Sequence, residues 1–213
     1  MTIAIIDYGS GNLHSAVKAF ERVCHDTALR HSITLTTDPD LLRNASHIVL
    51  PGVGAFADCI AGLKRIDGMV EALNECVLAQ QKPFLGICVG MQMMLEQSLE
   101  YGTHAGLGWI AGNVVPITPA DASLKIPHMG WNNLNIMNKS HMLLRNIAEG
   151  DHAYFVHSFH AQCDHPDHCL ATVDYGGSVS ACIGKDNMLG TQFHPEKSQR
   201  TGLQLIENFM RMT

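Results

Sequence analysis

Short apolar runs alternate with amphipathic stretches through the first half of the chain. Each run ends at a turn rich in Gly, Pro or Asp, and apolar residues then recur at helical spacing, which is typical of strand, loop and helix in succession. Continuous apolar strands of this kind indicate a parallel sheet covered by helices on both faces. The predicted strands are residues 2–7, 33–35, 47–50 and 83–87, and the predicted helices begin near Leu13, at Pro39, after Gly54 with a break at 67–68, and at Met91, the last extending to Leu99.

Strand patterns dominate the second half of the chain. From Gly106 onward, apolar runs are separated by Gly, Asp, Asn or Pro, and an amphipathic helix is predicted at 201–212. No repeat, charge block or Pro/Gly/Ser-rich linker divides the chain, so we expect one α/β domain with a mixed sheet over residues 1–213. The predicted strands are residues 109–117, 126–136, 154–159, 169–175, 179–183 and 188–193.

The composition excludes some partners. With 14 Lys+Arg against 20 Asp+Glu, the formal net charge is −6, which disfavours binding to nucleic acid or to an anionic membrane through the overall field. Hydrophobic residues make up 46% and charged residues 16%. This supplies a sizeable core, and the low charge fraction hints at a covered face. No apolar run in the sequence approaches the ~20 residues that a membrane-spanning helix needs.

Seven cysteines and thirteen histidines stand out. The odd, scattered cysteines do not resemble a disulfide framework, and residues 1–7 lack the pattern of a secretory signal, so we expect a reducing, cytoplasmic compartment. There, thiols and imidazoles serve as core or surface residues, as metal ligands, or as a nucleophile with its base.

Residues 9–14, Gly-Ser-Gly-Asn-Leu-His, follow a predicted strand and open a helix, as a dinucleotide-binding fingerprint does. However, His14 occupies the third glycine position, and no acidic residue follows the second strand at 34–37. We interpret the segment as a structural or interface turn and expect no nucleotide cofactor.

Residues 160–169 gather two thiols and three imidazoles, which are ligands that zinc favours. Their spacing lacks the paired knuckles of a zinc ribbon or finger. We interpret this segment as a polar loop between strands and expect no metal.

The segment Gly-Ile-Cys-Val-Gly at 86–90 is the strongest single signal for chemistry. A nucleophile at a sharp strand-to-helix turn needs small residues on both sides, because larger side chains would collide with neighbouring backbone. Cys88 holds the central position, and a helix N-terminus after it would favour the thiolate. We predict that Cys88 is a nucleophile and that the Val89 N–H faces the oxygen of the carbonyl under attack.

A thiol nucleophile needs a base and a group that orients the base. His194 and Glu196 supply an imidazole and a carboxylate at a strand end, and Pro195 fixes the backbone between them. Because the carboxyl ends of adjacent parallel strands converge, we predict a triad of Cys88, His194 and Glu196.

The segment Pro-Gly-Val-Gly at 51–54 follows another predicted strand. Its two glycines let peptide planes reorient at little steric cost, so the loop can direct an N–H toward a developing oxyanion. On its own, this is a common strand-to-helix turn.

In chain order, the segments at 51–54, 86–90 and 194–196 resemble those of the class I, triad-type glutamine amidotransferases, and the resemblance covers the whole chain. More narrowly, the chain is similar to the glutaminase subunits of imidazole glycerol phosphate synthases, from histidine biosynthesis. Asp-Tyr-Gly-Ser-Gly-Asn at 7–12 and His-Met-Gly-Trp-Asn at 128–132 discriminate these subunits from other glutaminases. The segments that carry the similarity are 7–12, 51–56, 86–92, 127–132, 154–159 and 191–198.

The resemblance implies a Rossmann-like, mainly parallel sheet flanked by helices, with an added antiparallel portion. It also implies hydrolysis of L-glutamine to glutamate and ammonia by Cys88, His194 and Glu196, without a cofactor. The implied oxyanion hole is Gly52, Val53 and Val89, and the implied glutamine contacts are Gly52, Gln92, His157, Ser158 and Phe159.

A partner is implied as well, a (β/α)8 synthase subunit that forms a heterodimer with this chain. The partner uses the channelled ammonia to make imidazole glycerol phosphate and aminoimidazole carboxamide ribotide. Asn12, Trp131 and Lys197 lie where related subunits meet the barrel, although a packed core indole is an equally good interpretation of Trp131. Because the glycines permit a peptide flip at 52–54, we hypothesise that the isolated chain is nearly inactive until its partner is loaded.

Alternatives with the same triad remain. One is a related glutaminase that feeds another acceptor, as in surface-sugar amination. Others are a triad cysteine protease, which would have no use for Gln92, and a non-catalytic barrel-binding regulator. The regulator would have lost Cys88, His194 or Glu196, and all three are present.

Overall fold

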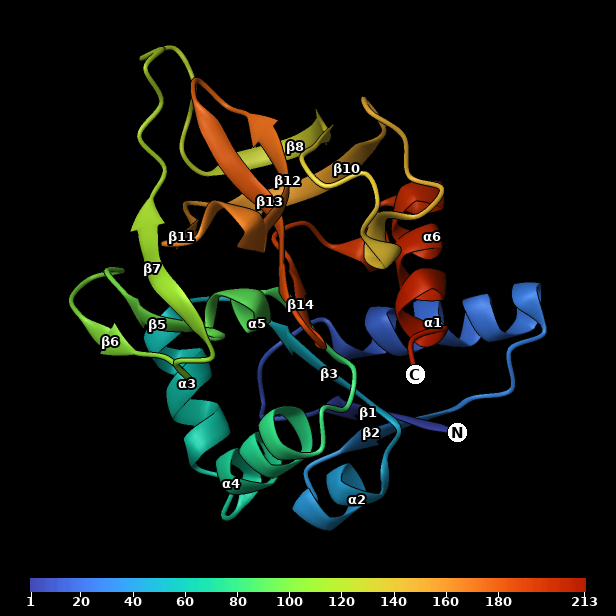
Figure 1. Cartoon of the computed structure of the whole chain (residues 1–213). Coiled ribbons are helices and arrows are strands. Elements are labelled where there is room, and N and C mark those ends of the chain that lie inside the picture. Colours follow the sequence, from blue (N-terminus) through green and yellow to red (C-terminus); the bar gives the residue numbers. More distant parts are fainter.

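The computed structural model describes all 213 residues and centres on an eight-stranded sheet of order β2-β1-β3-β4-β14-β13-β12-β9 (Figure 1). The neighbouring strands from β2 to β14 run parallel, and the last three run antiparallel. The predicted fold class is therefore confirmed. The strands are β1 Thr2–Ile6, β2 Ser32–Thr36, β3 His47–Gly52, β4 Phe84–Cys88, β14 Met188–Thr191, β13 Ser178–Lys185, β12 Cys169–Asp174 and β9 Asn135–Ile136.

Helices cover both faces of the parallel part. Helices α1 and α6 pack together on one side, where the rings of Phe20 and Phe209 meet edge to face at 6.3 Å between centroids. Helices α3 and α4 lie on the other side (Figure 1). None of the helices is both long enough and apolar enough to cross a bilayer. The helices are α1 Leu13–Thr27, α2 Pro39–Asn44, α3 Phe56–Lys64, α4 Met69–Asn74 continued by the π-helical η1 Glu75–Ala79, α5 Val89–Gln92 and α6 Gln199–Met210, with 3₁₀ turns η2 Met142–Leu144, η3 Pro166–His168 and η4 Pro195–Lys197.

Two smaller sheets complete the second half, a pair β10-β8 and a four-stranded sheet β11-β7-β5-β6. One cluster of 58 buried apolar residues runs from β1 to the end of the chain. A continuous core of this kind is what the predicted single domain over 1–213 requires. The strands of the smaller sheets are β5 Leu95–Ser98, β6 His104–Ala105, β7 Ile110–Pro116, β8 His128–Asn133, β10 His152–His157 and β11 Phe159–Cys163.

The helix expected from Met91 to Leu99 is wrong over most of its length. Helix α5 ends at Gln92, and residues 95–98 form β5 instead. Strand β5 pairs in parallel with β7 and antiparallel with β6, so tertiary strand pairing overrides the local helical spacing.

The polar loop expected at 160–169 is also wrong in part. Residues 160–163 belong to β11, which pairs with β7 and places His160 opposite Val115 and Ala161 opposite Val114. A single residue, Ser158, separates the end of β10 from the start of β11. Only residues 164–168 connect strands, partly as the one-turn helix η3.

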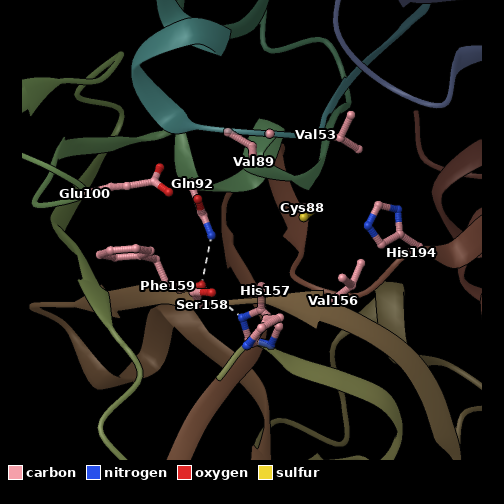
Figure 2. Close-up of a pocket in the computed structure, with 12 residues that line it drawn as sticks. Val53, Cys88, Val89, Gln92, Glu100, Val156, His157, Ser158, Phe159 and His194 are labelled. Atoms are coloured by element: carbon pink, nitrogen blue, oxygen red, sulfur yellow. Dashed lines mark hydrogen bonds between the residues drawn. The ribbon is translucent and has the colours of Figure 1, made fainter. Parts of the chain in front are cut away.

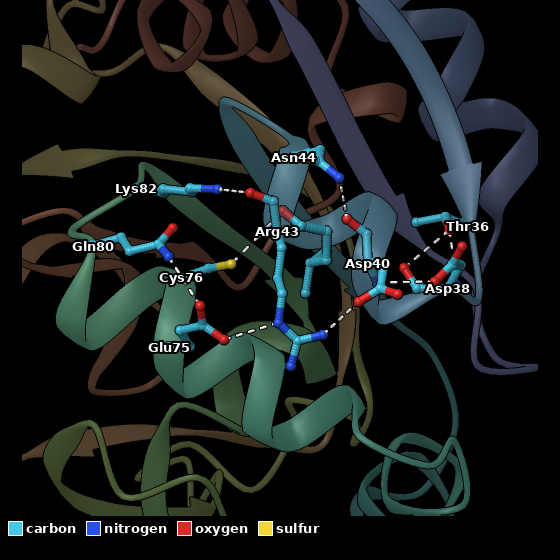
Figure 3. Close-up of polar contacts among 10 residues, drawn as sticks. Thr36, Asp38, Asp40, Arg43, Asn44, Glu75, Cys76, Gln80 and Lys82 are labelled. Atoms are coloured by element: carbon cyan, nitrogen blue, oxygen red, sulfur yellow. Dashed lines mark hydrogen bonds and ion pairs between the residues drawn. The ribbon is translucent and has the colours of Figure 1, made fainter.

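Surface ion pairs hold α2 against the helix of α4 and η1 (Figure 3). The Asp38 carboxylate accepts a hydrogen bond from the Asp40 N–H at 2.8 Å and caps α2, as the Asp-Pro-Asp pattern predicts. Arg43 donates to Asp40 at 2.9 Å and to Glu75 at 2.8 Å, and the Lys82 ammonium contacts the Arg43 carbonyl. This cluster joins segments 32 residues apart in sequence.

Candidate active site

Three neighbouring strands end side by side and bring the predicted site residues together. Gly52 lies opposite Cys88 in the β3–β4 register, and Thr191 lies opposite Ile87 in the β14–β4 register. The loop 52–54, the turn at Cys88 and the segment 192–196 therefore leave the sheet at one edge, as expected where parallel strands share a direction.

Cys88 occupies a strained turn between β4 and α5. Its backbone has φ 56° and ψ −111°, a positive φ that costs a residue with a side chain about 1–3 kcal/mol. A Cβ at Gly86 would lie 2.6 Å from the Gly90 oxygen, and a Cβ at Gly90 would lie 1.7 Å from the Leu50 oxygen. Neither flanking position accommodates a side chain, so the glycines are what permits this turn.

The helix after Cys88 is a single turn, Val89–Gln92. Such a short helix has only a small macrodipole. The expected stabilisation of a Cys88 thiolate by a helix N-terminus is therefore weak. A nearby cation is the stronger source of support, and His194 lines the same pocket as Cys88.

His194 and Glu196 form a buried pair. The Nδ1 atom of His194 lies 2.9 Å from Oε1 of Glu196, and the two side chains are only 3% and 4% exposed. Ser198 Oγ donates to the His194 carbonyl at 2.7 Å and accepts from the Tyr154 N–H at 3.0 Å, which fixes the backbone around the imidazole. His194 Nε2 is buried without a hydrogen-bond partner, so this atom remains free for a reacting group.

Opposing effects act on the pKa of His194. Burial lowers it, but contacts with the Cys88 sulfur and the Glu196 carboxylate outweigh burial and raise the pKa to about 10. At neutral pH the imidazole is therefore protonated, and its positive charge faces the thiol. This is the environment that activates a cysteine nucleophile.

The loop at 52–54 has its polar groups engaged outside the pocket. The Val53 N–H donates to Ser10 Oγ at 3.4 Å, while the Val53 carbonyl accepts from Ser10 Oγ at 2.6 Å and from Cys59 Sγ at 3.3 Å. The Tyr8 hydroxyl donates to the Pro51 carbonyl at 2.8 Å. The glycine-rich segment at 9–11 thus supports this loop, as the interpretation of a structural turn anticipates.

A pocket of about 310 Å³ opens over Cys88 (Figure 2). Its walls come from both halves of the chain. The residues that line it are Val53, Gly54, Cys88, Val89, Gln92, Glu100, Pro127, Val156, His157, Ser158, Phe159 and His194. Of the predicted oxyanion and glutamine-binding residues, only Gly52 does not line this pocket; it lines the small adjoining cavity of about 10 Å³ together with Asn12, His194 and Glu196.

Gln92 is held by both hydrogens of its side-chain amide. Its Nε2 donates to the Phe159 carbonyl at 3.0 Å (Figure 2) and to Gln192 Oε1 at 3.0 Å. Gln192 in turn donates through Nε2 to Cys88 Sγ at 3.6 Å. The amide of Gln92 is therefore fixed in orientation, with its oxygen left as a free acceptor beside the pocket.

Sequence reasoning missed Gln192 and Glu100. Gln192 follows Thr191 on the strand next to Cys88, so its place beside the predicted His194 could have identified it. Glu100 lines the pocket and accepts a hydrogen bond from the Phe56 N–H at 2.6 Å. No sequence signal pointed to Glu100, because the segment before it was expected to be helical.

The residues of this chain that were predicted to contact a partner lie at the surface near the pocket. Trp131 is 46% exposed, so the interpretation as a packed core indole is wrong. Its ring lies 5.9 Å from that of Tyr154, and the Lys197 ammonium lies 5.7 Å from the centre of the same Tyr154 ring. Asn12 is exposed at the start of α1.

The thiols and imidazoles of 160–169 do not converge. His165 and His168 meet edge to face at 5.3 Å, but Cys163 and Cys169 lie on β11 and β12. No group of three or more His, Cys, Asp or Glu side chains in the structure is arranged to hold a metal ion.

Comparison with known proteins agrees with this geometry. The model of the glutamine amidotransferase class-I family matches residues 4–212. The chain is 56% identical over 211 residues to imidazole glycerol phosphate synthase subunit HisH of Rhodospirillum rubrum, and 56% identical over 214 residues to the subunit of that name from Mesorhizobium japonicum, covering 99% of each chain in both cases. A solved structure of a glutamine amidotransferase shares the fold with a TM-score of 0.69 at 15% identity, over 96% of this chain and 98% of that one. The chain therefore belongs to the class I glutamine amidotransferases, and within them to the family of HisH subunits of imidazole glycerol phosphate synthase.

Proposed function

We propose that this chain hydrolyses L-glutamine to glutamate and ammonia and delivers the ammonia to a (β/α)8 synthase subunit in histidine biosynthesis. The observation that carries the proposal is the strained Cys88 turn in one pocket with His194, whose imidazole forms a buried pair with Glu196. The 56% identity to HisH subunits favours this acceptor over one in surface-sugar amination. The complete triad disfavours a non-catalytic regulator.

In the first half of the reaction, the Cys88 thiolate attacks the side-chain amide carbon of glutamine. The resulting tetrahedral intermediate collapses as the carbon–nitrogen bond breaks, and the free Nε2 of His194 gives its proton to the departing nitrogen. The products of this step are ammonia and a γ-glutamyl thioester on Cys88.

In the second half, His194 accepts a proton from water, which attacks the thioester carbon. Collapse of the second tetrahedral intermediate expels the Cys88 thiolate and releases glutamate. Glu196, 2.9 Å from Nδ1, orients the imidazole and stabilises its protonated form in both halves. The reaction consumes one water and requires no cofactor.

The oxyanion of both intermediates needs N–H donors, for which we propose Val89 and the 52–54 loop. In the free chain the Val53 N–H donates to Ser10 Oγ instead. Gly54 has φ +96° and open space around it, so the loop has the freedom to reorient. This supports the hypothesis that the loop completes the oxyanion hole only when the loaded partner is bound.

The pocket offers complementary groups to the two ends of glutamine. The free Oε1 of Gln92 can accept a hydrogen bond from the substrate, and the Glu100 carboxylate can pair with its α-ammonium group. The backbone around Ser158 and Phe159 lines the same wall. Gly52 acts from the adjoining cavity by shaping the loop.

We further propose that the exposed face of β8 and its surroundings meets the barrel subunit. Met129 and Trp131 are 62% and 46% exposed on this strand, and Lys197 lies over Tyr154 beside them. Large apolar side chains at the surface are typical of a protein interface. Asn12, in the cavity next to Glu196, extends the proposed interface toward the active site, where a sealed contact would keep ammonia from water.

The chemistry also sets the compartment. All seven cysteines are free in the structure, and the proposed mechanism requires the Cys88 thiol to stay reduced. We therefore propose that the protein works in a reducing cytoplasm.

The test is Cys88→Ala, assayed with the barrel subunit for synthesis from glutamine and, separately, from ammonium salts. We expect glutamine-dependent synthesis to disappear and ammonia-dependent synthesis to remain. Full glutamine-dependent turnover in the variant would defeat the nucleophile assignment.

A further inference from the structure

Two buried imidazoles stand in contact behind the wall of the pocket. His128 of β8 and His157 of β10 are register partners in the antiparallel pair, and His128 Nδ1 lies 3.0 Å from His157 Nε2. His157 lines the pocket, whereas His128 does not. The proposed hydrolysis uses neither ring as acid or base, so the contact needs another explanation.

The neighbours of the two rings fix the direction of every hydrogen bond. His157 Nδ1 lies 2.9 Å from the Phe159 carbonyl, which only accepts, so Nδ1 carries a proton. Asn132 Nδ2, which only donates, lies 3.3 Å from His128 Nε2 and 2.9 Å from the Asp174 carbonyl. His128 therefore accepts at Nε2 and donates from Nδ1, and His157 accepts at Nε2.

Burial keeps both rings in the neutral form that this arrangement needs. Desolvation lowers the pKa of His128 to about 4; desolvation and the neighbouring imidazoles lower that of His157 to about 3. His128 is also clamped between aromatic rings, 4.9 Å from the centroid of Phe155 and 4.1 Å from that of Tyr175. The ring is thus held by stacking as well as by its hydrogen bonds.

The chain of donors continues into the active site. The Phe159 carbonyl, which accepts from His157, also accepts from Gln92 Nε2, and Gln92 donates in addition to Gln192. Gln192 reaches Cys88 Sγ. One set of oriented hydrogen bonds therefore links Asn132 on β8 to the amide that faces the substrate.

We propose that His128 is a positioning residue for glutamine binding, which acts through His157 to hold the Phe159 carbonyl and, with it, the Gln92 amide in the orientation that leaves Oε1 free. The inference rests on the proposed glutaminase function. Without the donor at His128, Nε2 of His157 is left without a partner in a buried site. This costs free energy, which a change of tautomer or a rotation of the ring can relieve. The Phe159 carbonyl then loses its second donor, and Gln92 can turn its amide and present Nε2 to the substrate.

The kinetic test compares His128→Phe with His128→Asn in the complex with the barrel subunit. Phenylalanine keeps an aromatic ring for stacking but has no donor, whereas the Nδ2 of asparagine can replace the Nδ1 of histidine. We expect His128→Phe to raise the KM for glutamine about tenfold, the effect of losing one buried hydrogen bond, with kcat changed much less. His128→Asn should restore most of the loss, and synthesis from ammonium salts should be unchanged in both.

The spectroscopic test needs no activity and uses the unmodified chain. Long-range ¹H–¹⁵N correlation spectra, assigned with the two His128 variants and His157→Gln, should show both rings as neutral Nδ1–H tautomers. An Nε2–H tautomer at His157, or a His128→Phe enzyme that is folded and has an unchanged KM, would overturn the inference. If the unmodified complex does not hydrolyse glutamine, the proposed function fails instead, and the tautomers still decide the geometry.

Discussion

The His194–Glu196 pair and the Arg43 ion pairs are both short contacts between groups of opposite charge, in contrasting surroundings. The first lies beside the pocket, with side chains 3% and 4% exposed. The second lies on the surface, where Arg43 and Asp40 of α2 meet Glu75 of η1 and the two carboxylate side chains are 83% and 45% exposed (Figure 3). Both have nitrogen–oxygen distances of 2.8 to 2.9 Å, so distance alone does not distinguish them.

Burial decides what such a contact does. Water screens the Arg43 pairs, so they add little to stability and tie α2 to its neighbours mainly by geometry. The buried pair has no water to replace a lost partner, so Cys88 and Glu196 together raise the pKa of His194 despite its burial.

The largest effect is expected on catalysis. Replacing the base in His194→Asn, or its orienting group in Glu196→Gln, should lower kcat for glutamine hydrolysis by about 10²–10⁴-fold, because proton transfer to the leaving group and from water is lost or misdirected. Steady-state release of glutamate in the complex with the barrel subunit measures this. Glu75→Gln, which removes a carboxylate from the surface cluster, is the matched control and should keep kcat within about twofold.

The second effect is on stability and concerns the turn that carries Cys88. Gly90→Ala places a methyl group of helix α5 against the Leu50 carbonyl of β3, so α5 and β3 must separate. We expect a loss of about 3 kcal/mol or more in the free energy of unfolding, measured by urea titration. A loss below about 1 kcal/mol would mean that the backbone at this turn relaxes easily, contrary to the close packing described above.

The third effect is a pH dependence. The pKa of His194 is raised from 6.5 to about 10 in the folded chain, so the folded state binds an extra proton between these values. The stabilisation is fully present below pH 6.5 and is lost as the pH rises through 10. Urea titrations across this range should show a decline on the order of a few kcal/mol in the unmodified chain and a shallower one in Glu196→Gln. If the free energy of unfolding declined equally with pH in both proteins, the His194–Glu196 pair would not be a source of this pH dependence.

The smallest effect is expected at the surface. Arg43→Ala breaks both ion pairs on α2, yet it should lower the thermal midpoint by only a few degrees and leave glutamine hydrolysis unchanged. Because these pairs are screened, 1 M NaCl should remove most of the difference between variant and parent. A large drop in the thermal midpoint that persists in 1 M NaCl would show that the surface cluster behaves like the buried pair.

The sequence could predict features that depend on the local backbone, but not those that depend on contacts between distant segments. The parallel strands and the turn at Cys88 were predictable, because apolar runs and paired glycines report directly on backbone requirements. The strand at 95–98 could not be predicted, because it forms by pairing with β7 and β6. The local spacing of apolar residues carries no information about such distant partners. Strand β11 was hidden for the same reason, since His160 and Cys163 suggested a polar loop.

The site shows a similar limit. His194 and Glu196 could be predicted because a short motif places both groups at one strand end. Glu100 and Gln192 act through contacts with Phe56, Gln92 and Cys88, which join segments 44 to 104 residues apart in sequence. The position of Gln192 two residues before His194 is visible in the sequence, but its contacts with Gln92 and Cys88 appear only in the folded chain.

We propose that the Sγ atom of Cys88, close to the buried His194–Glu196 pair, attacks glutamine. The most direct test of this proposal is intact mass spectrometry of the complex, acid-quenched during turnover of glutamine, followed by peptide mapping. We expect a mass increase of one γ-glutamyl group, on Cys88 and on none of the other six cysteines, and more of this adduct in Glu196→Gln, where the misoriented His194 activates water poorly. Glutamate release with no adduct in either protein, or an adduct on a different cysteine, would contradict it.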